Sequence, residues 1–226
     1  MLLRIIICIV LGYAFGCIST GYLIGKANHV DIRRYGSGNA GTTNALRTLG
    51  WKAGALTLIG DILKAVIPIL AVRYLLFPDM EYERSQLLVL YTGLGVVLGH
   101  NYPVWLHFKG GKGIAATGGA MLAFDIRIFP IAAVLFLGAV GITRYVSLGS
   151  LLLAVLFPCW VGFTNPGDFH MLAVSLLYTV SAFYMHRTNI RRLLNGTENK
   201  LGQRVKISSK DTEQENNKGK DGTSKS

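Results

Sequence analysis

The residues best suited to chemistry lie in three polar stretches that interrupt an otherwise apolar chain. The first, residues 36–44, reads Gly-Ser-Gly-Asn-Ala-Gly-Thr-Thr-Asn, and Arg47 follows it. Small residues leave backbone N–H groups accessible, and such a loop ahead of a helix binds anions. A guanidinium adds a bidentate donor for a phosphate or carboxylate. We interpret this stretch as an anion-binding segment; the alternative is a tight, capped turn at a membrane edge.

The second stretch, residues 99–113, ends in Lys-Gly-Gly-Lys-Gly at positions 109–113. Glycines allow the backbone to approach a phosphate closely, and the two lysines supply positive charge, so this sequence favours phosphate binding. The spacing is not that of a Walker A loop. The alternative is an interfacial loop that is anchored by its aromatic residues and lysines. His100 and His107 have no further ligand at a suitable spacing, so the stretch predicts no metal site.

The third stretch, residues 186–199, begins with His-Arg-Thr-Asn. His186 and Asn189 are three residues apart and would share one face of a helix. Basic residues are expected at the cytoplasmic end of a last membrane span, so Arg191 and Arg192 carry less weight. His186 and Asn189 are less easily explained by charge alone, which makes them candidate functional residues.

Polar residues inside or beside the apolar runs are further candidates. Asp61 and Lys64 are three residues apart within one run. Ionisable residues in a membrane span are costly and are functional candidates by default. The alternative is that Asp61 and Lys64 only neutralise each other. Ser147 and Ser150 lie at the start of another run, where Ser147 suits a helix N-cap and either hydroxyl suits a contact to a phosphate.

The elements that must position these residues are membrane helices. The 226 residues are 51% hydrophobic and only 15% charged, with a mean hydropathy of +0.41. Soluble domains carry about 25% charged residues, so the composition excludes an ordinary soluble protein and a disordered chain. The net charge of +11 would suit a nucleic-acid binder, but the apolar runs do not, and we expect no nucleic-acid partner. The runs predict an all-α, polytopic membrane protein with about seven transmembrane helices, near 2–25, 53–77, 86–98, 113–124, 128–142, 147–163 and 169–185.

The charges also predict a topology. With seven crossings, 18 of the 23 Lys and Arg residues fall on one side of the membrane. The positive-inside rule then places the N-terminus outside, and the C-terminus and all three polar stretches in the cytoplasm. We expect a membrane domain over residues 1–201. Residues 202–226 contain few apolar side chains and are predicted to form a disordered polar cytoplasmic tail.

Taken together, the three stretches supply cations, glycine N–H groups and small hydroxyls on one side of the membrane. None supplies a nucleophile paired with a base, a metal cluster or paired carboxylates. The pattern predicts a site for anionic head groups at the membrane edge. If that site is catalytic, it works mainly by positioning and charge stabilisation.

These motifs resemble those of the acyl-phosphate-dependent glycerol-3-phosphate acyltransferases of bacteria, the PlsY family. The resemblance rests on Gly-Ser-Gly-Asn-x-Gly-x-Thr-Asn at 36–44, on Gly-His-Asn-Tyr-Pro and Lys-Gly-Gly-Lys-Gly within 99–113, on His-Arg-x-Asn at 186–189, and on Asp-x-x-Lys in the second span. It covers about residues 1–201, with the motifs in the order of the family. The departures are Ala40, where a proline is expected, and a longer polar tail.

The resemblance implies an enzyme that transfers an acyl group from acyl phosphate to the sn-1 hydroxyl of glycerol 3-phosphate. The products are lysophosphatidic acid and inorganic phosphate, and the reaction is the first step of bacterial phospholipid synthesis. The implied setting is the bacterial inner membrane, among membrane lipids, with the active site facing the cytoplasm. The resemblance implies no metal, no cofactor and no protein general base, and we expect a monomer.

The resemblance also assigns roles to residues. The glycerol 3-phosphate side is expected to comprise Ser37, Gly38, Asn39, Thr43, Asn44 and Arg47. The acyl phosphate is expected to contact Lys109, Gly110, Gly111, Lys112, Gly113 and Ser150. The expected catalytic residues are His186, Asn189, Lys112 and Asp61, where Asp61 binds a glycerol hydroxyl or orients a lysine.

Two other functions compete with this interpretation. An acyl-CoA-dependent acyltransferase would use a His-x4-Asp pair, but no histidine of the chain has an aspartate five residues later. A transporter of organic phosphates would also contain glycine-interrupted helices and charges within the membrane. However, the two halves of the chain show no repeat, and the polar groups crowd one face of the membrane.

Overall fold

The computed structural model describes residues 1–203, and all regular structure in that range is helical. The elements are α1 (Leu2–Gly16), α2 (Thr20–Ala27), η1 (Ile32–Arg34), α3 (Thr42–Leu49), α4 (Trp51–Ala71), η2 (Val72–Leu76), α5 (Tyr82–Asn101), η3 (Val104–Leu106), α6 (Ile114–Phe124), α7 (Ile128–Thr143), α8 (Val146–Thr164), α9 (Phe169–Met185) and α10 (Arg187–Leu194). The predicted all-α class is confirmed. The predicted tail, 202–226, lies outside the described residues from position 204 onward.

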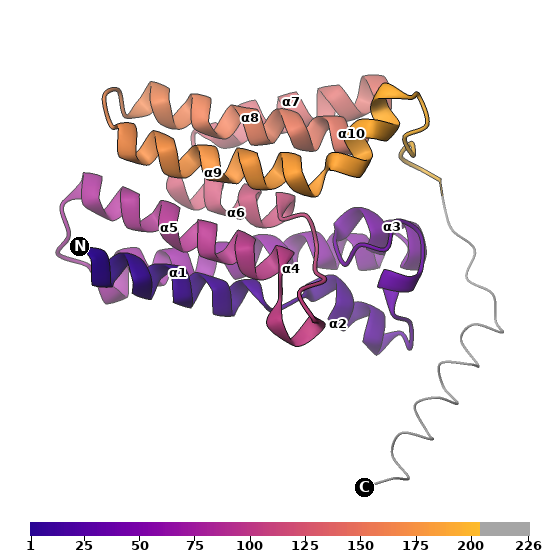
Figure 1. The fold of residues 1–226 in the computed structure, drawn as a ribbon, viewed down its shortest axis with the longest axis horizontal. Helices are drawn as coiled ribbons and strands as arrows, with labels where there is room; N and C mark the ends of the chain where they lie inside the picture. The colour runs from indigo at the N-terminus through magenta and orange to yellow at the C-terminus, as the bar shows by residue number, and fades with distance from the viewer. Residues whose placement is uncertain (204–226) are drawn as a thin grey trace, which may run out of the picture.

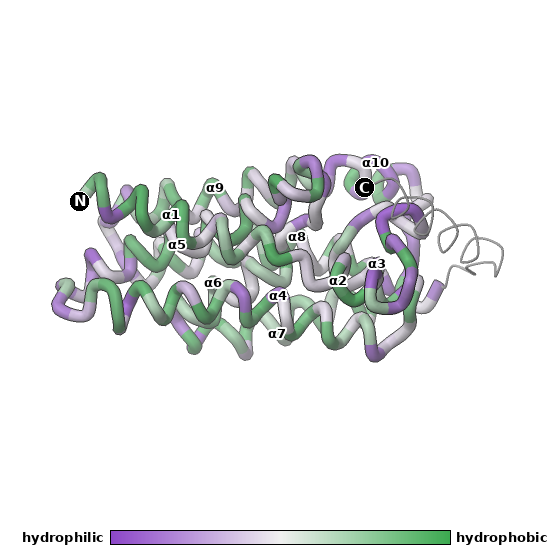
Figure 2. The backbone as a smooth tube through the Cα atoms, turned by 90° about the horizontal axis from the view of Figure 1, so that it is seen from below, coloured by the Kyte–Doolittle hydropathy of each residue, from purple (hydrophilic) through white to green (hydrophobic). Residues whose placement is uncertain are grey.

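The long helices run along one axis of the molecule and stack in two layers (Figure 1). One layer contains α7, α8 and α9, the other contains α1, α4 and α5, and α6 lies between them. Hydrophilic residues gather at the end that carries α3 and α10, with a smaller group at the opposite end (Figure 2). Hydrophobic residues dominate between the two ends, which is the distribution of a protein whose middle lies in a bilayer.

Helix α5 is central, and most of its residues are buried. It packs closely against α1, because glycines of each helix face the backbone of the other. A Cβ at Gly95 or Gly99 would collide with the carbonyls of Ile9 or Tyr13. Small residues allow helix backbones to approach in this way and are common at helix interfaces in membranes. The remaining faces of α5 meet α6 and α9 in the main hydrophobic core.

All seven predicted apolar runs lie largely within helices. Four segments are long and apolar enough to cross a membrane: Leu2–Ala27, Trp51–Leu76, Tyr82–Leu106 and Val146–Thr164. Helices α6, α7 and α9 are apolar but shorter. Length and composition therefore support four spans directly.

The first span is not the continuous helix that the apolar run suggests, because the chain breaks between α1 and α2. Two carbonyls at the break accept hydrogen bonds from distant side chains. The Cys17 carbonyl accepts from Trp105 Nε1 (2.7 Å), and the Ile18 carbonyl accepts from Lys64 Nζ (2.8 Å). A bilayer core offers no water to such groups, so these protein donors stabilise the break.

The polar stretches that the charge pattern assigns to one side do meet at one end of the molecule. These stretches are residues 26–52, 99–112, 143–146 and, within the described part, 186–203. Each of them contributes lining residues to one cavity there. Arg144 and Leu201 join two of the stretches through hydrogen bonds of 2.7 and 2.8 Å. Met1 lies at the opposite end (Figure 1).

Candidate active site

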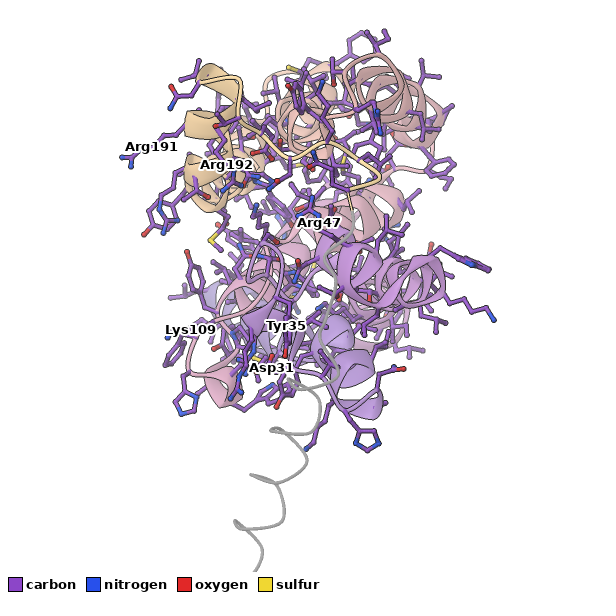
Figure 3. The ribbon with its side chains drawn as sticks, turned by 90° about the vertical axis from the view of Figure 1, so that its right-hand side faces the viewer. Asp31, Tyr35, Arg47, Lys109, Arg191 and Arg192 are labelled. Carbon is purple, nitrogen blue, oxygen red and sulfur yellow. The ribbon has the colours of Figure 1, made fainter. Side chains whose placement is uncertain are left out.

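A cavity of about 410 Å³ lies at the polar end of the molecule. Its polar lining comes mainly from the loops and helix ends around α3 and α10. These residues are Ser37, Asn39, Thr43, Arg47, Asp61, His100, Lys112, Ser147, Ser150, His186, Asn189, Arg192 and Glu198. The apolar lining comes from α4, α6 and α7 and includes Leu58, Ile62, Met121, Leu122, Phe129 and Phe136. Figure 3 looks onto this end, where α3 supplies Arg47 and α10 supplies Arg192.

The loop between η1 and α3 is held in shape by the buried side chain of Asn44. The Asn44 amide nitrogen donates to the carbonyls of Ile32 (2.7 Å) and Asn39 (2.8 Å). The Asn44 oxygen accepts from the Ser37 N–H, and the Asn39 oxygen accepts from the Gly41 N–H, both at 2.9 Å. These bonds occupy the Asn44 amide. In the structure this predicted binding residue therefore shapes the loop that presents Ser37 and Asn39 to the cavity.

Arg47 lines the cavity, and its side chain makes no hydrogen bond or salt bridge within residues 1–203. Burial lowers the pKa of its guanidinium; the charge of Glu198 opposes this shift, and the charge of Arg192 adds to it. An arginine nevertheless stays protonated at physiological pH. Arg47 therefore presents a fixed positive charge that an anion can neutralise.

Lys112 contacts α10, where its ammonium donates to the side-chain oxygen of Asn189. The Asn189 amide donates to Glu198 (2.7 Å), which also accepts from Ser147 Oγ (3.0 Å) and Arg192 Nε (2.7 Å). Burial disfavours the charge of Glu198, but these three hydrogen bonds outweigh it and lower the pKa of the carboxyl group. Glu198 is therefore ionised, and it orients Asn189 toward Lys112.

Burial shifts the protonation of two groups at the site. It lowers the pKa of Lys112 to about 8, so the ammonium form dominates at neutral pH. It lowers the pKa of His186 to about 4, and the charge of Lys112 acts in the same direction. His186 Nδ1 lies 2.8 Å from the Ala182 carbonyl, so this nitrogen carries the proton. His186 Nε2 is left as a hydrogen-bond acceptor.

Asp61, Lys64 and His100 form a buried cluster beside this polar lining. Lys64 Nζ lies 2.8 Å from Asp61 Oδ1 and 2.7 Å from His100 Nδ1. The His100 ring lies so close to Gly111 that a Cβ there would overlap it. The His100 carbonyl also accepts from the Gly111 N–H (2.9 Å). The cluster therefore holds the 109–113 loop in place.

The carboxylates that line the cavity are each neutralised by a neighbouring cation. Asp61 pairs with Lys64 at 2.8 Å, and Glu198 pairs with Arg192 at 2.7 Å. An ionised group buried without a partner is costly, so the remaining cations favour an anionic ligand. Among the described lining residues, the cations without a carboxylate partner are Arg47 and Lys112.

The cavity brings together most of the residues that the sequence predicts for the site. They are Ser37, Asn39, Thr43, Asn44, Arg47, Asp61, Lys112, Gly113, Ser150, His186 and Asn189. Four predicted residues do not line it. Gly110 and Gly111 shape the loop through backbone hydrogen bonds to the 100–101 carbonyls. Gly38 and Lys109 line a second, separate pocket.

Sequence reasoning missed Glu198 and gave little weight to Arg192, although both line the cavity. Glu198 is the one acidic residue among the cations of the 186–199 stretch. Its isolation among cations could have singled out Glu198 as a candidate. However, the sequence around it is as polar as the tail that follows, so it does not stand out from that tail. Only the fold shows that its side chain is 5% exposed and bonded to three other residues.

Comparison with known proteins identifies the family. A family model described as glycerol-3-phosphate acyltransferase matches residues 6–196. The chain belongs to this family. It is 46% identical over 202 residues to the glycerol-3-phosphate acyltransferase of Clostridioides difficile (strain 630), covering 88% of this chain and 96% of that one. It is 42% identical over 189 residues to that of Geobacter sulfurreducens, covering 84% and 93%.

The fold is similar to that of solved acyltransferase structures. One is PlsY (YgiH), an integral membrane glycerol 3-phosphate acyltransferase, in its glycerol 3-phosphate form; the TM-score is 0.78 at 35% identity, covering 88% of this chain and 96% of that chain. The lysophosphatidic acid form of PlsY gives a TM-score of 0.76 at 34% identity, with the same coverage. With its apolar helices, the chain is therefore an integral membrane acyltransferase.

Proposed function

We propose that this acyltransferase moves an acyl group from acyl phosphate to the sn-1 hydroxyl of glycerol 3-phosphate, giving lysophosphatidic acid and inorganic phosphate. The main support is the presence of Arg47 and Lys112 in one cavity without carboxylate partners among the described residues. Two phosphate-bearing substrates repel each other, and two such cations offset that repulsion. The related PlsY structures are in glycerol 3-phosphate and lysophosphatidic acid forms, which match the acceptor and the product.

The apolar part of the cavity supports a lipid donor. Leu58, Phe129 and Leu137 line it and are also exposed on the helix surface. Exposed apolar residues on membrane helices face lipid, so the cavity is expected to open toward the bilayer core. An acyl chain then extends along α4 and α7 while its phosphate stays at the polar end.

The proposed reaction begins when the glycerol hydroxyl oxygen attacks the acyl carbonyl carbon. The ester C–O bond forms, the bond between the carbonyl carbon and the phosphate oxygen breaks, and the hydroxyl proton leaves with the phosphate. His186 is a weak base because its pKa is about 4, and the inorganic phosphate that leaves is a stronger base, since even a phosphate monoester has a second pKa of about 6. We therefore assign proton acceptance to the donor phosphate, and orientation of the hydroxyl to His186 Nε2.

The proposed roles follow the positions of the polar groups. Arg47 and Ser37 bind the phosphate of glycerol 3-phosphate, and Lys112 and the Gly113 N–H bind the phosphate of the donor. The Asp61 carboxylate is buried and makes no hydrogen bond within residues 1–203 beyond its ion pair with the neighbouring lysine. We assign it to the second glycerol hydroxyl. Further polar contacts come from Asn39, Thr43, Ser150 and Asn189.

We also propose seven membrane crossings, with the N-terminus outside and the cavity facing the cytoplasm of a bacterial cell. An odd number of crossings agrees with the location of Met1 opposite the polar end (Figure 1). Of the 23 Lys and Arg residues, 18 belong to the stretches assigned to that end. We expect the inner membrane, where the donor is dissolved, and a monomer, since one chain forms the whole cavity.

The proposal is tested with the purified full-length chain, palmitoyl phosphate and glycerol 3-phosphate. We expect phosphate release only when both substrates are present, and no product when palmitoyl-CoA replaces palmitoyl phosphate. A strict requirement for palmitoyl-CoA would overturn the proposed donor. Nuclear magnetic resonance of the purified product gives the acyl position, and an acyl group at the central glycerol carbon would contradict the sn-1 assignment.

A further inference from the structure

A second pocket of about 360 Å³, the outer pocket, lies beside the cavity and has no part in the reaction above. It is lined by Asp31, Arg33, Arg34, Gly38, His107 and Lys109, among others. Its two walls directly follow the candidate spans Leu2–Ala27 and Tyr82–Leu106. The outer pocket therefore lies where two spans end, at the level of the lipid head groups. In the view onto this end, Lys109 and Asp31 lie below Arg47 and Arg192 (Figure 3).

The outer pocket carries excess positive charge. Arg33 is neutralised by Asp31, through side-chain hydrogen bonds of 2.9 and 3.0 Å, and it also stacks 4.7 Å from the ring centroid of Tyr22. The Lys109 side chain makes no hydrogen bond or salt bridge within residues 1–203. Lys109 is therefore a cation of the outer pocket with no carboxylate partner among the described residues, which suits the pocket to an anion.

An apolar rim adjoins these charges. Val104, Trp105 and Phe108 expose 57, 45 and 58% of their surface. Trp105 is held in position by its bond to the Cys17 carbonyl (2.7 Å) and by an edge contact to Tyr22, with 5.3 Å between ring centroids. Aromatic residues beside cations are typical of a surface that contacts both acyl chains and head groups. A free small anion would use the charges but would leave this rim without a partner.

The outer pocket and the cavity share two walls. Gly38 lines the outer pocket, whereas its neighbours Ser37 and Asn39 line the cavity. Lys109 lines the outer pocket, whereas Lys112 lines the cavity. A ligand in the outer pocket therefore contacts both loops that form the polar part of the active site.

We propose that the outer pocket binds the phosphate head group of an anionic membrane lipid and that this lipid activates the enzyme. Lys109 contacts the phosphate, and the lipid chains lie along Val104, Trp105 and Phe108. By holding the two shared loops, the lipid favours the arrangement of the active-site cations that the reaction requires. Activity would then depend on the anionic lipid content of the membrane.

The activity test compares the full-length enzyme in vesicles of phosphatidylcholine alone and in vesicles that also contain phosphatidylglycerol. We expect phosphatidylglycerol to raise kcat/KM about fivefold, the factor that one lysine near an anionic surface provides. Lys109→Gln should lose most of this response. Lys52→Gln removes the same charge from an exposed residue at the same end and should keep it. Equal responses in the two variants would overturn the proposal.

A binding test is independent of activity and therefore of the proposed reaction. Phosphatidylglycerol with a photoreactive group is crosslinked to the enzyme in vesicles, and the labelled peptides are identified by mass spectrometry. We expect labelling of residues 104–109 that Lys109→Gln reduces and Lys52→Gln does not. Labelling spread over all lipid-facing helices, without this difference, would refute the site.

A third measurement separates a lipid from a free anion. Glycerophosphoglycerol, the head group without acyl chains, is added to enzyme in phosphatidylcholine vesicles, and inorganic phosphate is added in a parallel sample. We expect neither to raise kcat/KM, because neither contacts the apolar rim. Full activation by either soluble anion would contradict a lipid site.

Discussion

The two ends of the helix bundle both carry charged side chains, but they use them differently. At the end opposite α3 and α10, the Asp125 carboxylate accepts hydrogen bonds from Arg127 (2.8 Å) and from Trp160 Nε1 (3.1 Å). Arg73 donates to the side-chain oxygen of Gln86. These groups satisfy each other where short loops connect the helices, and the result is a set of stable helix ends.

At the polar end, by contrast, the two carboxylates of the cavity are paired while Arg47 and Lys112 have no carboxylate partner among the described residues. Unneutralised charge is costly inside a protein, and the cost is tolerated where a ligand supplies the opposite charge. Charge left without a partner, rather than charge alone, therefore distinguishes the candidate active site from the opposite end. Substitutions at the two ends should therefore have different consequences.

The largest effect is expected for Lys112→Ala, which removes one of these cations. A charge-assisted hydrogen bond to phosphate contributes about 1.5–3 kcal/mol, and charge stabilisation of the transition state adds to it. We expect kcat/KM to fall by about 100-fold or more, with little change in the midpoint of thermal unfolding. Lys52→Ala, which changes an exposed lysine at the same end, should keep wild-type activity. Normal kinetics in Lys112→Ala would exclude it from the site.

Gly111→Ala should have the next largest effect, because the new Cβ would overlap the His100 ring. The 109–113 loop must then move, and a shift of about 1 Å near reacting groups costs up to about 100-fold in rate. We expect kcat/KM to fall by about 10-fold to 100-fold. The matched control is Gly138→Ala on α7, where a Cβ meets no atom within 4 Å. A loss of activity in both variants would point to a general effect of alanine on folding.

The helices were predictable from sequence because each membrane helix forms its backbone hydrogen bonds within itself. An apolar run is therefore enough to predict a helix. The break between α1 and α2 was not predictable from the run. It depends on Lys64 and Trp105, which donate to its carbonyls from residues 46 and 88 positions further along the chain. Local pattern therefore predicts where helices form, whereas distant donors decide where one is interrupted.

The candidate site shows the same division. Asp61 and Lys64 could be paired from their spacing, but His100, which completes their cluster, lies 36 residues beyond Lys64. Lys109 and Lys112 belong to one motif and have the same chemistry, so sequence alone assigned both to the acyl phosphate. The two lysines line different pockets because of the path that the backbone takes through the glycines between them. The spacing of residues in the sequence does not predict this path.

A pH profile tests the charge of a single group at the polar end, Lys112. The pKa of Lys112 is lowered to about 8, and only the ammonium form attracts phosphate. We expect kcat/KM to change little just below pH 8 and to fall about tenfold for each pH unit well above it, since the ammonium fraction falls by that factor. Lys112→Arg keeps its charge throughout this range and should lose the decline, even if its overall activity is lower. An unchanged decline in Lys112→Arg would assign the titration to another group.

The smallest effect is expected at the opposite end, for Asp125→Asn. Asparagine retains one acceptor oxygen for Trp160 Nε1, and it loses the charge and the second acceptor that face Arg127, whose side chain is 71% exposed. Exposed ion pairs contribute little to stability, so the midpoint of thermal unfolding should fall by about 2 °C or less and kcat/KM should stay within about twofold. Asp61→Asn makes the same chemical change beside the cavity, where Lys64 depends on the carboxylate, and it should lower activity strongly. Equal losses of activity in the two variants would contradict the proposed difference between the two ends of the bundle.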